Sequence, residues 1–221
     1  FLKRLFSLFV LFSCTLSALA QTNISGIVNE YAAVSSASGS VVTVSNALDI
    51  ATYSAGDKIL LMQMKGTKIS EVNDATYGEI ISFDGAGNYE FNEIASISGT
   101  DITMLYPLCK EYLSALHPVQ VIRVPVYNDA TVVGDVTGNP WDGATGGVVA
   151  FEVKGTLTLN ADIDAESLGF RGGDVSTNAI AADADLYVCD ITTGEGGIKG
   201  EGIIAIPDAA CRGKLANGGG G

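Results

Sequence analysis

The stretch GTLTLNADIDAESLGFRGG, residues 155–173, begins as a strand, ends in glycine turns and belongs to a longer alternating pattern. From residue 149 to residue 165, apolar side chains occupy one parity and mostly polar ones the other. The apolar parity comprises Val149, Phe151, Val153, Leu157, Leu159, Ala161, Ile163 and Ala165. A single strand of this length would run roughly 55 Å, whereas most strands stop after about 5–6 residues. We therefore expect the chain to turn corners here without losing its apolar inner face.

Two dipeptides, at residues 154–155 and 160–161, are candidate corners. A two-residue hairpin at the first would set Val153 opposite Thr156 and pair an inward side chain with an outward one. A three-residue loop restores the parity, but it puts Gly155 in the middle position and not in the last, left-handed one. In a parallel β-solenoid, short strands meet at bends and stacked rungs share one interior. The pattern favours the solenoid.

Glycines punctuate the second half of the chain. Pairs or longer runs stand at residues 146–147, 172–173, 196–197 and 218–221. Glycine pairs permit positive φ and close approach of neighbouring chains, as the tight corners of stacked rungs require. We therefore predict an all-β protein. A small N-terminal β-barrel or sandwich-like unit spans residues 21–126, and the truncated start of a glycine-rich parallel β-solenoid spans residues 127–221.

The N-terminal unit has short β-branched or apolar runs separated by turn residues. We expect strands near residues 41–44, 59–64, 79–83, 89–97, 102–105 and 119–126. The turns at 84–88 and 98–101 predict a meander of the strands beside them, and the strand at 119–126 closes the unit. The one helix-like stretch is 110–116.

Residues 1–20 have the features of an export signal peptide. Lys3 and Arg4 precede an apolar run, and an A-x-A cleavage motif at 18–20 precedes Gln21. The alternative is lipid attachment at Cys14. We expect a secreted or outer cell-surface protein, and no later apolar run reaches the roughly 18 residues of a membrane span.

Acidic residues outnumber Lys and Arg by 25 to 12, and the formal net charge is −13. A surface of this charge repels phosphate backbones, so we predict no nucleic-acid partner. Three cysteines remain after signal cleavage. In an oxidising compartment Cys189 and Cys211 are expected to form a disulfide that closes a glycine-rich stretch, and Cys109 is expected to be free and buried.

Residues that could carry catalysis are scarce. His117 is the single histidine, and no nucleophile-elbow pattern accompanies it. The glycines at 200 and 202 loosely match a dinucleotide fingerprint, but Pro207 blocks the helix that should follow. We therefore predict no enzymatic activity, and a metal site made of histidine and cysteine is excluded by the shortage of ligands.

Acidic pairs leave a hard-cation site open. Asp162 and Asp164 share a face by strand parity, with Glu166 nearby, and Asp183 and Asp185 form a second pair. Such pairs face solvent, bind calcium, or serve as acid and base in glycoside cleavage, and calcium is the one cofactor this sequence suggests. Asp162 and Asp164 are the predicted calcium ligands.

Two residues near the glycine turns have alternative roles. Trp141 is predicted either to serve as a ligand platform for a sugar ring or to cap the solenoid core. Arg171 is expected to be a turn residue that bonds backbone carbonyls or a carboxylate such as Asp174.

Four segments together resemble a known group of proteins: GDKILLMQMKG (56–66), VQVIRVPVY (119–127), GNPWDGATGGVVAFEVKGTLTLNADIDAESLGFRGG (138–173) and GGIKGEGI (196–203). They are similar to the N-terminal region of large secreted, glycine-rich, adhesin-like surface proteins of Bacteroidetes-type bacteria, which often end in a type IX secretion sorting domain. The resemblance implies a cell-surface or extracellular protein that is not an enzyme. It supplies no catalytic or binding residues.

The function expected from these observations is that of a secreted or cell-surface structural protein of adhesin type. One alternative is a polysaccharide-acting enzyme built on a β-helix, and another is a non-catalytic carbohydrate-binding module. The expected partners are a surface polysaccharide or another cell-surface protein, and the oligomeric state is left open.

Overall fold

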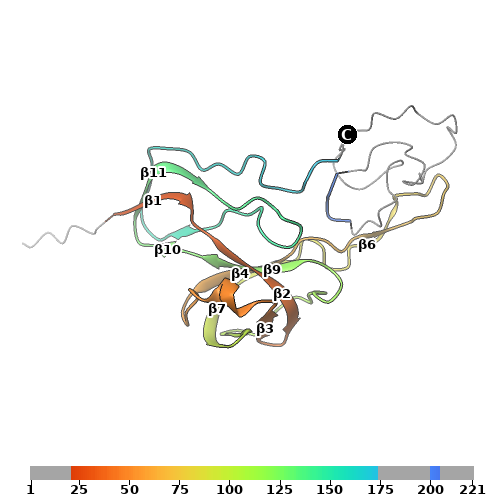
Figure 1. Ribbon diagram of the computed structural model, residues 1–221, viewed down its shortest axis with the longest axis horizontal. Coiled ribbons are helices and arrows are strands. Elements are labelled where there is room, and N and C mark those ends of the chain that lie inside the picture. The colour runs from red at the N-terminus through yellow and green to blue at the C-terminus, as the bar shows by residue number, and fades with distance from the viewer. Residues whose placement is uncertain (1–20, 174–199, 205–221) are drawn as a thin grey trace, which may run out of the picture.

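The computed structural model describes residues 21–173 and 200–204, and this part of the chain is all-β apart from one 3-10 turn, η1 (Ala47–Ile50). Figure 1 shows two regions: a barrel, and beside it the strands β1 (Thr22–Ile27), β10 (Val126–Tyr127) and β11 (Ala130–Thr137). The predicted all-β class is confirmed.

Six strands form the barrel: β2 (Glu30–Ser38), β3 (Val41–Val44), β8 (Asp101–Met104), β7 (Tyr89–Ser98), β4 (Lys58–Gln63) and β9 (Val119–Val124), in that order around the closed sheet. Strand β9 closes the barrel because Ile122 lies opposite Tyr31 of β2 on one side and Leu60 of β4 on the other. Alternate side chains of these strands fill the interior, and Ile59, Leu61, Ile94, Ile102 and Val121 are almost wholly buried.

Two expectations for this unit are wrong. Strand β6 (Ile80–Ser82) pairs with β5 (Lys68–Ile69) and not with β7, so the meander begins only at β7. Residues 110–116 contain no helix, and the chain makes a turn in which the N–H groups of Leu116 and His117 donate to the Leu113 carbonyl. A stretch this short does not recover the cost of starting a helix.

Parallel pairing organises the remaining strands. Strands β1 (Thr22–Ile27), β11 (Ala130–Thr137) and β13 (Leu157–Leu159) lie side by side in that order, and β10 (Val126–Tyr127) pairs with β12 (Glu152–Val153). Ile24, Val132 and Leu159 stand in one row across the three-stranded sheet. Strand β1 therefore belongs with the parallel strands, although we expected it inside the 21–126 unit.

Residues 154–156 form a corner. Strands β12 and β13, on either side of it, each pair with an earlier strand, and no described residues join them as a hairpin. At the corner Asp129 Oδ1 accepts a hydrogen bond of 2.6 Å from the Thr156 N–H, 27 residues later in the chain. A Cβ at Gly155 would collide with that carboxylate, so glycine is required here.

The apolar parity faces the interior of the parallel unit, but it is covered unevenly. Val149, Phe151 and Val153 are half-buried and pack on a core of Ile24, Ala130, Val132 and Val136. Leu157, Leu159 and Ile163 are 37%, 59% and 43% exposed. Strand β13 is at the edge of its sheet in the described part of the chain, so no neighbouring strand on that side covers these side chains.

Side-chain amides attach residues 146–150 to the barrel. The Gln120 amide bonds both backbone groups of Gly146, at 3.0 and 2.9 Å, and the Asn29 amide does the same for Ala150. Between them the Tyr31 hydroxyl donates to the Val148 carbonyl. This side-chain ladder holds residues 146–150, which precede β12, against the barrel at β9 and the start of β2.

Candidate functional site

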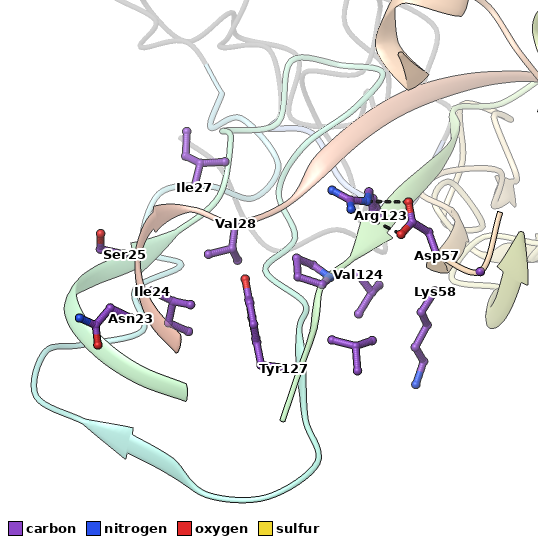
Figure 2. Close-up of a pocket in the computed structure, with 13 residues that line it drawn as sticks. Asn23, Ile24, Ser25, Ile27, Val28, Asp57, Lys58, Arg123, Val124 and Tyr127 are labelled. Carbon is purple, nitrogen blue, oxygen red and sulfur yellow. Dashed lines mark hydrogen bonds and ion pairs between the residues drawn. The ribbon is translucent and has the colours of Figure 1, made fainter. Parts of the chain in front are cut away.

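Two adjoining cavities lie where the barrel meets the parallel strands, and both are lined by Gly56, Lys58 and Val126. The larger, of about 610 Å³, runs between β1 and the junction of β9 with β10 (Figure 2). The smaller, of about 430 Å³, is bounded by Phe91 and Tyr106. We call these two cavities together the junction groove.

Ion pairs occupy the charged side of the larger cavity. Arg123 Nε donates to Asp57 Oδ2 at 2.8 Å, and a second guanidinium nitrogen lies 3.5 Å from Glu30. The hydrogen bond to Asp57 raises the pKa of Arg123 above its ordinary value. Figure 2 shows this pair on one side of the cavity and the Tyr127 ring, with Ile24 and Val28 near it, on the other. The guanidinium of Arg123 is therefore paired with two carboxylates of the protein, those of Asp57 and Glu30.

The smaller cavity combines two exposed aromatic rings with polar side chains. Phe91 of β7 is 51% exposed and Tyr106, just after β8, is 63% exposed. The polar and charged lining consists of Lys58, Asn92, Glu93, Glu152 and Lys154. A pocket with aromatic surface and a few hydrogen-bonding groups is suited to a small organic or saccharide ligand.

Lys58 lies at the centre of the groove. Its ammonium forms an ion pair with Glu152 of β12 and lies 5.1 Å from the centre of the Phe91 ring. The hydrogen bond from Lys58 lowers the pKa of Glu152, so this carboxylate is ionised at neutral pH. Strand β4 of the barrel is in this way connected to β12 of the parallel unit across the groove.

Asn92 organises the aromatic end of the groove. It is 7% exposed, and its Nδ2 donates to the Tyr106 carbonyl at 2.9 Å while Oδ1 accepts from the Tyr106 N–H at 3.2 Å. The same Oδ1 accepts from the Glu93 N–H at 2.9 Å. These hydrogen bonds fix the backbone of Tyr106, so the position from which its side chain extends is held while the ring stays exposed.

A third cavity, of about 420 Å³, shares Lys58, Phe91 and Glu152 with the junction groove. The rest of its lining is apolar: Val124, Val149, Ala150, Phe151 and Ile163. It extends the hydrophobic surface available beside Phe91.

Trp141 lies outside the junction groove. The residue is 3% exposed, and its ring meets the edge of Phe170 with centroids 5.7 Å apart. Its Nε1 is buried without a hydrogen-bond partner among the described residues. A ring this deeply buried offers no open face to a sugar in this structure, which corrects the ligand-platform expectation.

Arg171 bonds a carboxylate, but one far along the chain. Its Nε and one terminal nitrogen each lie 2.8 Å from an oxygen of Glu201, and Lys65 Nζ lies 2.8 Å from the same carboxylate. Lys65 also stands over the Phe170 ring at 5.4 Å. Asp174, the partner suggested above, lies outside the described residues.

The predicted calcium ligands are exposed and lie apart from the groove. The Asp162 N–H donates to Asp135 Oδ1, and Asp164 Oδ1 accepts from the Glu166 N–H in a local turn. Within residues 21–173 and 200–204, no three His, Cys, Asp or Glu side chains are grouped so that they could hold a metal ion. Calcium binding stays a prediction.

The cysteine and histidine expectations have different outcomes. Cys109 is exposed, which contradicts the expected burial. Cys14, the Cys189–Cys211 pair and the acidic pair Asp183 and Asp185 lie outside the described residues. His117 does not line the junction groove, and both its ring nitrogens are buried without a hydrogen-bond partner in the described part.

The sequence contained one unused signal for the groove. Along β7, the buried residues Asn92 and Ile94 have the inward parity, and Tyr89, Phe91 and Glu93 have the outward one. Of these two exposed aromatic residues, Phe91 lines the groove and Tyr89 does not. Nothing local in the sequence indicated that Lys58, Tyr106 and Glu152 would join Phe91.

No protein-family model and no curated protein matches this chain. The solved structures that are similar to it include two phage tailspikes. The Gp54 tailspike of Acinetobacter baumannii bacteriophage AP22, solved with A. baumannii capsular saccharide, is 12% identical over 62% of this chain and 22% of its own, with a TM-score of 0.34. The tailspike gp49 of Pseudomonas phage LKA1 is 18% identical over 55% of this chain and 20% of its own, with a TM-score of 0.28. The chain thus spans about a fifth of each tailspike. In the described residues, no helix is long and apolar enough to cross a membrane.

Proposed function

We propose that this chain is part of a secreted or cell-surface structural protein of adhesin type, and that its junction groove binds a saccharide chain without cleaving it. The observation that carries the proposal is the pair of exposed rings, Phe91 and Tyr106, beside a cavity of about 430 Å³ lined with amide, carboxylate and ammonium groups. The export signal and the resemblance to surface proteins of Bacteroidetes-type bacteria support the cellular placement.

The chemistry of the groove suits a sugar. The C–H faces of a pyranose are apolar and pack on aromatic rings, while its hydroxyls need hydrogen-bond partners. Phe91 and Tyr106 supply the rings, and the Glu93 and Glu152 carboxylates accept hydroxyl hydrogens. The Asn92 amide holds the Tyr106 backbone in place, which limits the ordering cost of binding.

The state of Glu152 supports binding without hydrolysis. Glycoside cleavage needs a carboxylic acid that keeps its proton until the leaving group takes it. Lys58 lowers the pKa of Glu152, which favours the ionised form. This opposes a role for Glu152 as the acid of glycoside cleavage, and a polysaccharide-acting enzyme is the alternative function.

The parallel strands support an architecture that continues as a β-solenoid. Ala130 of β11 lies beside Leu157 of β13, and an isolated bridge sets Val136 beside Ile163, so the alignment of the two chain segments holds through successive residues. Asp129 and Asp135 accept hydrogen bonds from the N–H groups of Thr156 and Asp162, each 27 residues later in the chain, which repeats the same spacing. In the proposed protein, the barrel caps one end of the solenoid and the groove lies at their junction.

The proposal is tested with the purified secreted chain and a panel of immobilised polysaccharides. Phe91→Ala and Tyr106→Ala should each weaken binding about tenfold, because each removes a stacking face. Tyr89→Ala is the matched control, since this ring is 54% exposed on the same strand but does not line the groove. Absence of binding to every polysaccharide, or equal losses in all three variants, would contradict the proposal, and release of new reducing ends would establish the enzyme instead.

A further inference from the structure

The charges of the junction groove indicate which saccharides it accepts. We infer that the groove selects neutral saccharide chains over chains that carry carboxylates. This inference rests on the saccharide-binding function proposed above and names the substrate class of that site.

The lysine nearest the aromatic rings is already neutralised. Lys58 Nζ is paired with Glu152 and lies over the Phe91 ring, so two protein groups share its charge. A uronate that reached for this ammonium would have to displace Glu152 and leave that carboxylate without its partner. The exchange replaces one ion pair by another and brings two carboxylates close together.

The second lysine of the cavity, Lys154, is exposed and follows Glu152 by two residues. The positive charge of Lys154 contributes to lowering the pKa of Glu152, after the larger effect of Lys58. The smaller cavity thus holds two lysines, Lys58 and Lys154, and two glutamates, Glu93 and Glu152. It has no surplus of positive charge to attract an anion.

Glu93 supplies a negative charge, and its Cα partner across the β4–β7 pair is Lys58. Glu93 is exposed on the outward face of β7, and no ion pair of the described residues includes it. Its carboxylate accepts hydrogen bonds from hydroxyls but repels a uronate at the same position. Hydroxyl-rich neutral sugars therefore match the free hydrogen-bonding groups better than acidic ones.

In the larger cavity, too, the arginine is paired with protein carboxylates. Arg123, which lines it, is bonded to Asp57 at 2.8 Å and lies 3.5 Å from Glu30, so this cation also has protein partners. At longer range, the formal net charge of −13 repels an approaching polyanion. Both the local and the long-range electrostatics disfavour acidic chains.

The experiment compares acidic polymers with their own neutral derivatives. Polygalacturonate, alginate and glucuronan are each immobilised beside the carboxyl-reduced form of the same polymer, and neutral glucans, mannans and galactans complete the panel. We expect the tightest neutral ligand to bind at least about tenfold more tightly than any acidic polymer, with the preference falling as salt screens the repulsion. Acidic binding equal to or tighter than neutral binding would overturn this inference while the saccharide-binding function stands. Binding to no member of the panel would instead defeat the proposed function, and with it this inference.

A charge variant makes the test specific to the groove. Glu93→Gln removes a carboxylate of the smaller cavity and should reduce the ratio of neutral to acidic affinity by about threefold or more. Glu166→Gln makes the same change of charge at an exposed residue outside the groove and should leave the ratio unchanged. An unchanged ratio in Glu93→Gln, or equal changes in both variants, would contradict the assigned role of Glu93.

Discussion

The buried amide of Asn92 bonds both backbone groups of Tyr106, donating to its carbonyl at 2.9 Å and accepting from its N–H at 3.2 Å. An asparagine side chain here acts as one more backbone unit of the sheet, where the chain leaves β8. The bond couples the stability of the barrel to the position of an exposed ring in the groove.

Asn92→Ala should destabilise the fold by about 1–3 kcal/mol, because it leaves backbone groups of Tyr106 without partners. Urea unfolding monitored by circular dichroism measures the change. Saccharide affinity should also fall under conditions where the variant is folded, since Tyr106 is no longer held.

The matched control for this variant is Asn88→Ala. Asn88 is half-buried, and its side chain makes an exposed hydrogen bond to the Glu111 carbonyl at 3.1 Å. Its removal should change stability by about 0.5 kcal/mol or less. Equal losses of stability in Asn92→Ala and Asn88→Ala would show that the hydrogen bonds of Asn92 contribute no more to stability than that of Asn88.

The ladder between the barrel and residues 146–150 gives a second prediction. Gln120 is 0% exposed, and Gln120→Leu leaves both backbone groups of Gly146 without partners, at an expected cost of about 1–3 kcal/mol. Thermal unfolding followed by near-ultraviolet circular dichroism detects the loss. Gln21→Leu is the control, because Gln21 is exposed and bonds the Ala130 carbonyl and the Thr158 hydroxyl at the sheet edge. A near-silent Gln120→Leu would refute the structural role of this ladder.

Alanine substitutions at two glycines of one turn distinguish the cost of backbone strain from the cost of steric crowding. Gly85 and Gly87 have φ of +81° and +79°, so alanine at either should cost about 1–2 kcal/mol in the left-handed region. A Cβ at Gly85 would lie 2.8 Å from Gln63 Oε1, whereas a Cβ at Gly87 meets no atom within 4 Å. Gly85→Ala should therefore be the more destabilising by about 1 kcal/mol or more, since the buried Gln63 amide must move. Equal free energies of unfolding for the two variants would contradict this.

The carboxylate of Glu201 gives a pH-dependent prediction. The hydrogen bonds from Arg171, and then that from Lys65, lower its pKa far below the ordinary glutamate value. Because the folded-state pKa lies below the unfolded value of about 4.3, the stabilisation is complete above that value. It is lost as the pH falls through the folded-state pKa.

Glu201→Gln should accordingly be destabilising at neutral pH, and its difference from wild type should shrink in strong acid. Urea midpoints at about pH 7, 4 and 2 measure this. Glu166→Gln, at an exposed position, should match wild type throughout. A pH-independent difference for Glu201→Gln would show that its ionisation does not stabilise the fold.

Local alternation in the sequence was enough to predict the all-β class, most strands of the barrel and the corner near Gly155. A period of two residues is a property of the extended backbone itself, so it is visible before any partner strand is known. The helix expected at residues 110–116 was wrong, because so short a helical pattern is not stable without packing. The expected burial of Cys109 was also wrong.

Tertiary structure alone decided which strands meet. Strand β1 pairs with β11, more than a hundred residues along the chain. Glu201 likewise bonds Lys65, 136 residues before it, and also Arg171, 30 residues before it. The junction groove arises in the same way, because Lys58, Phe91, Tyr106 and Glu152 come from four separate segments. Local sequence encodes the conformation of each segment, whereas the free energy of joining distant segments depends on shared burial and complementary polar groups, which exist only once the chain has folded.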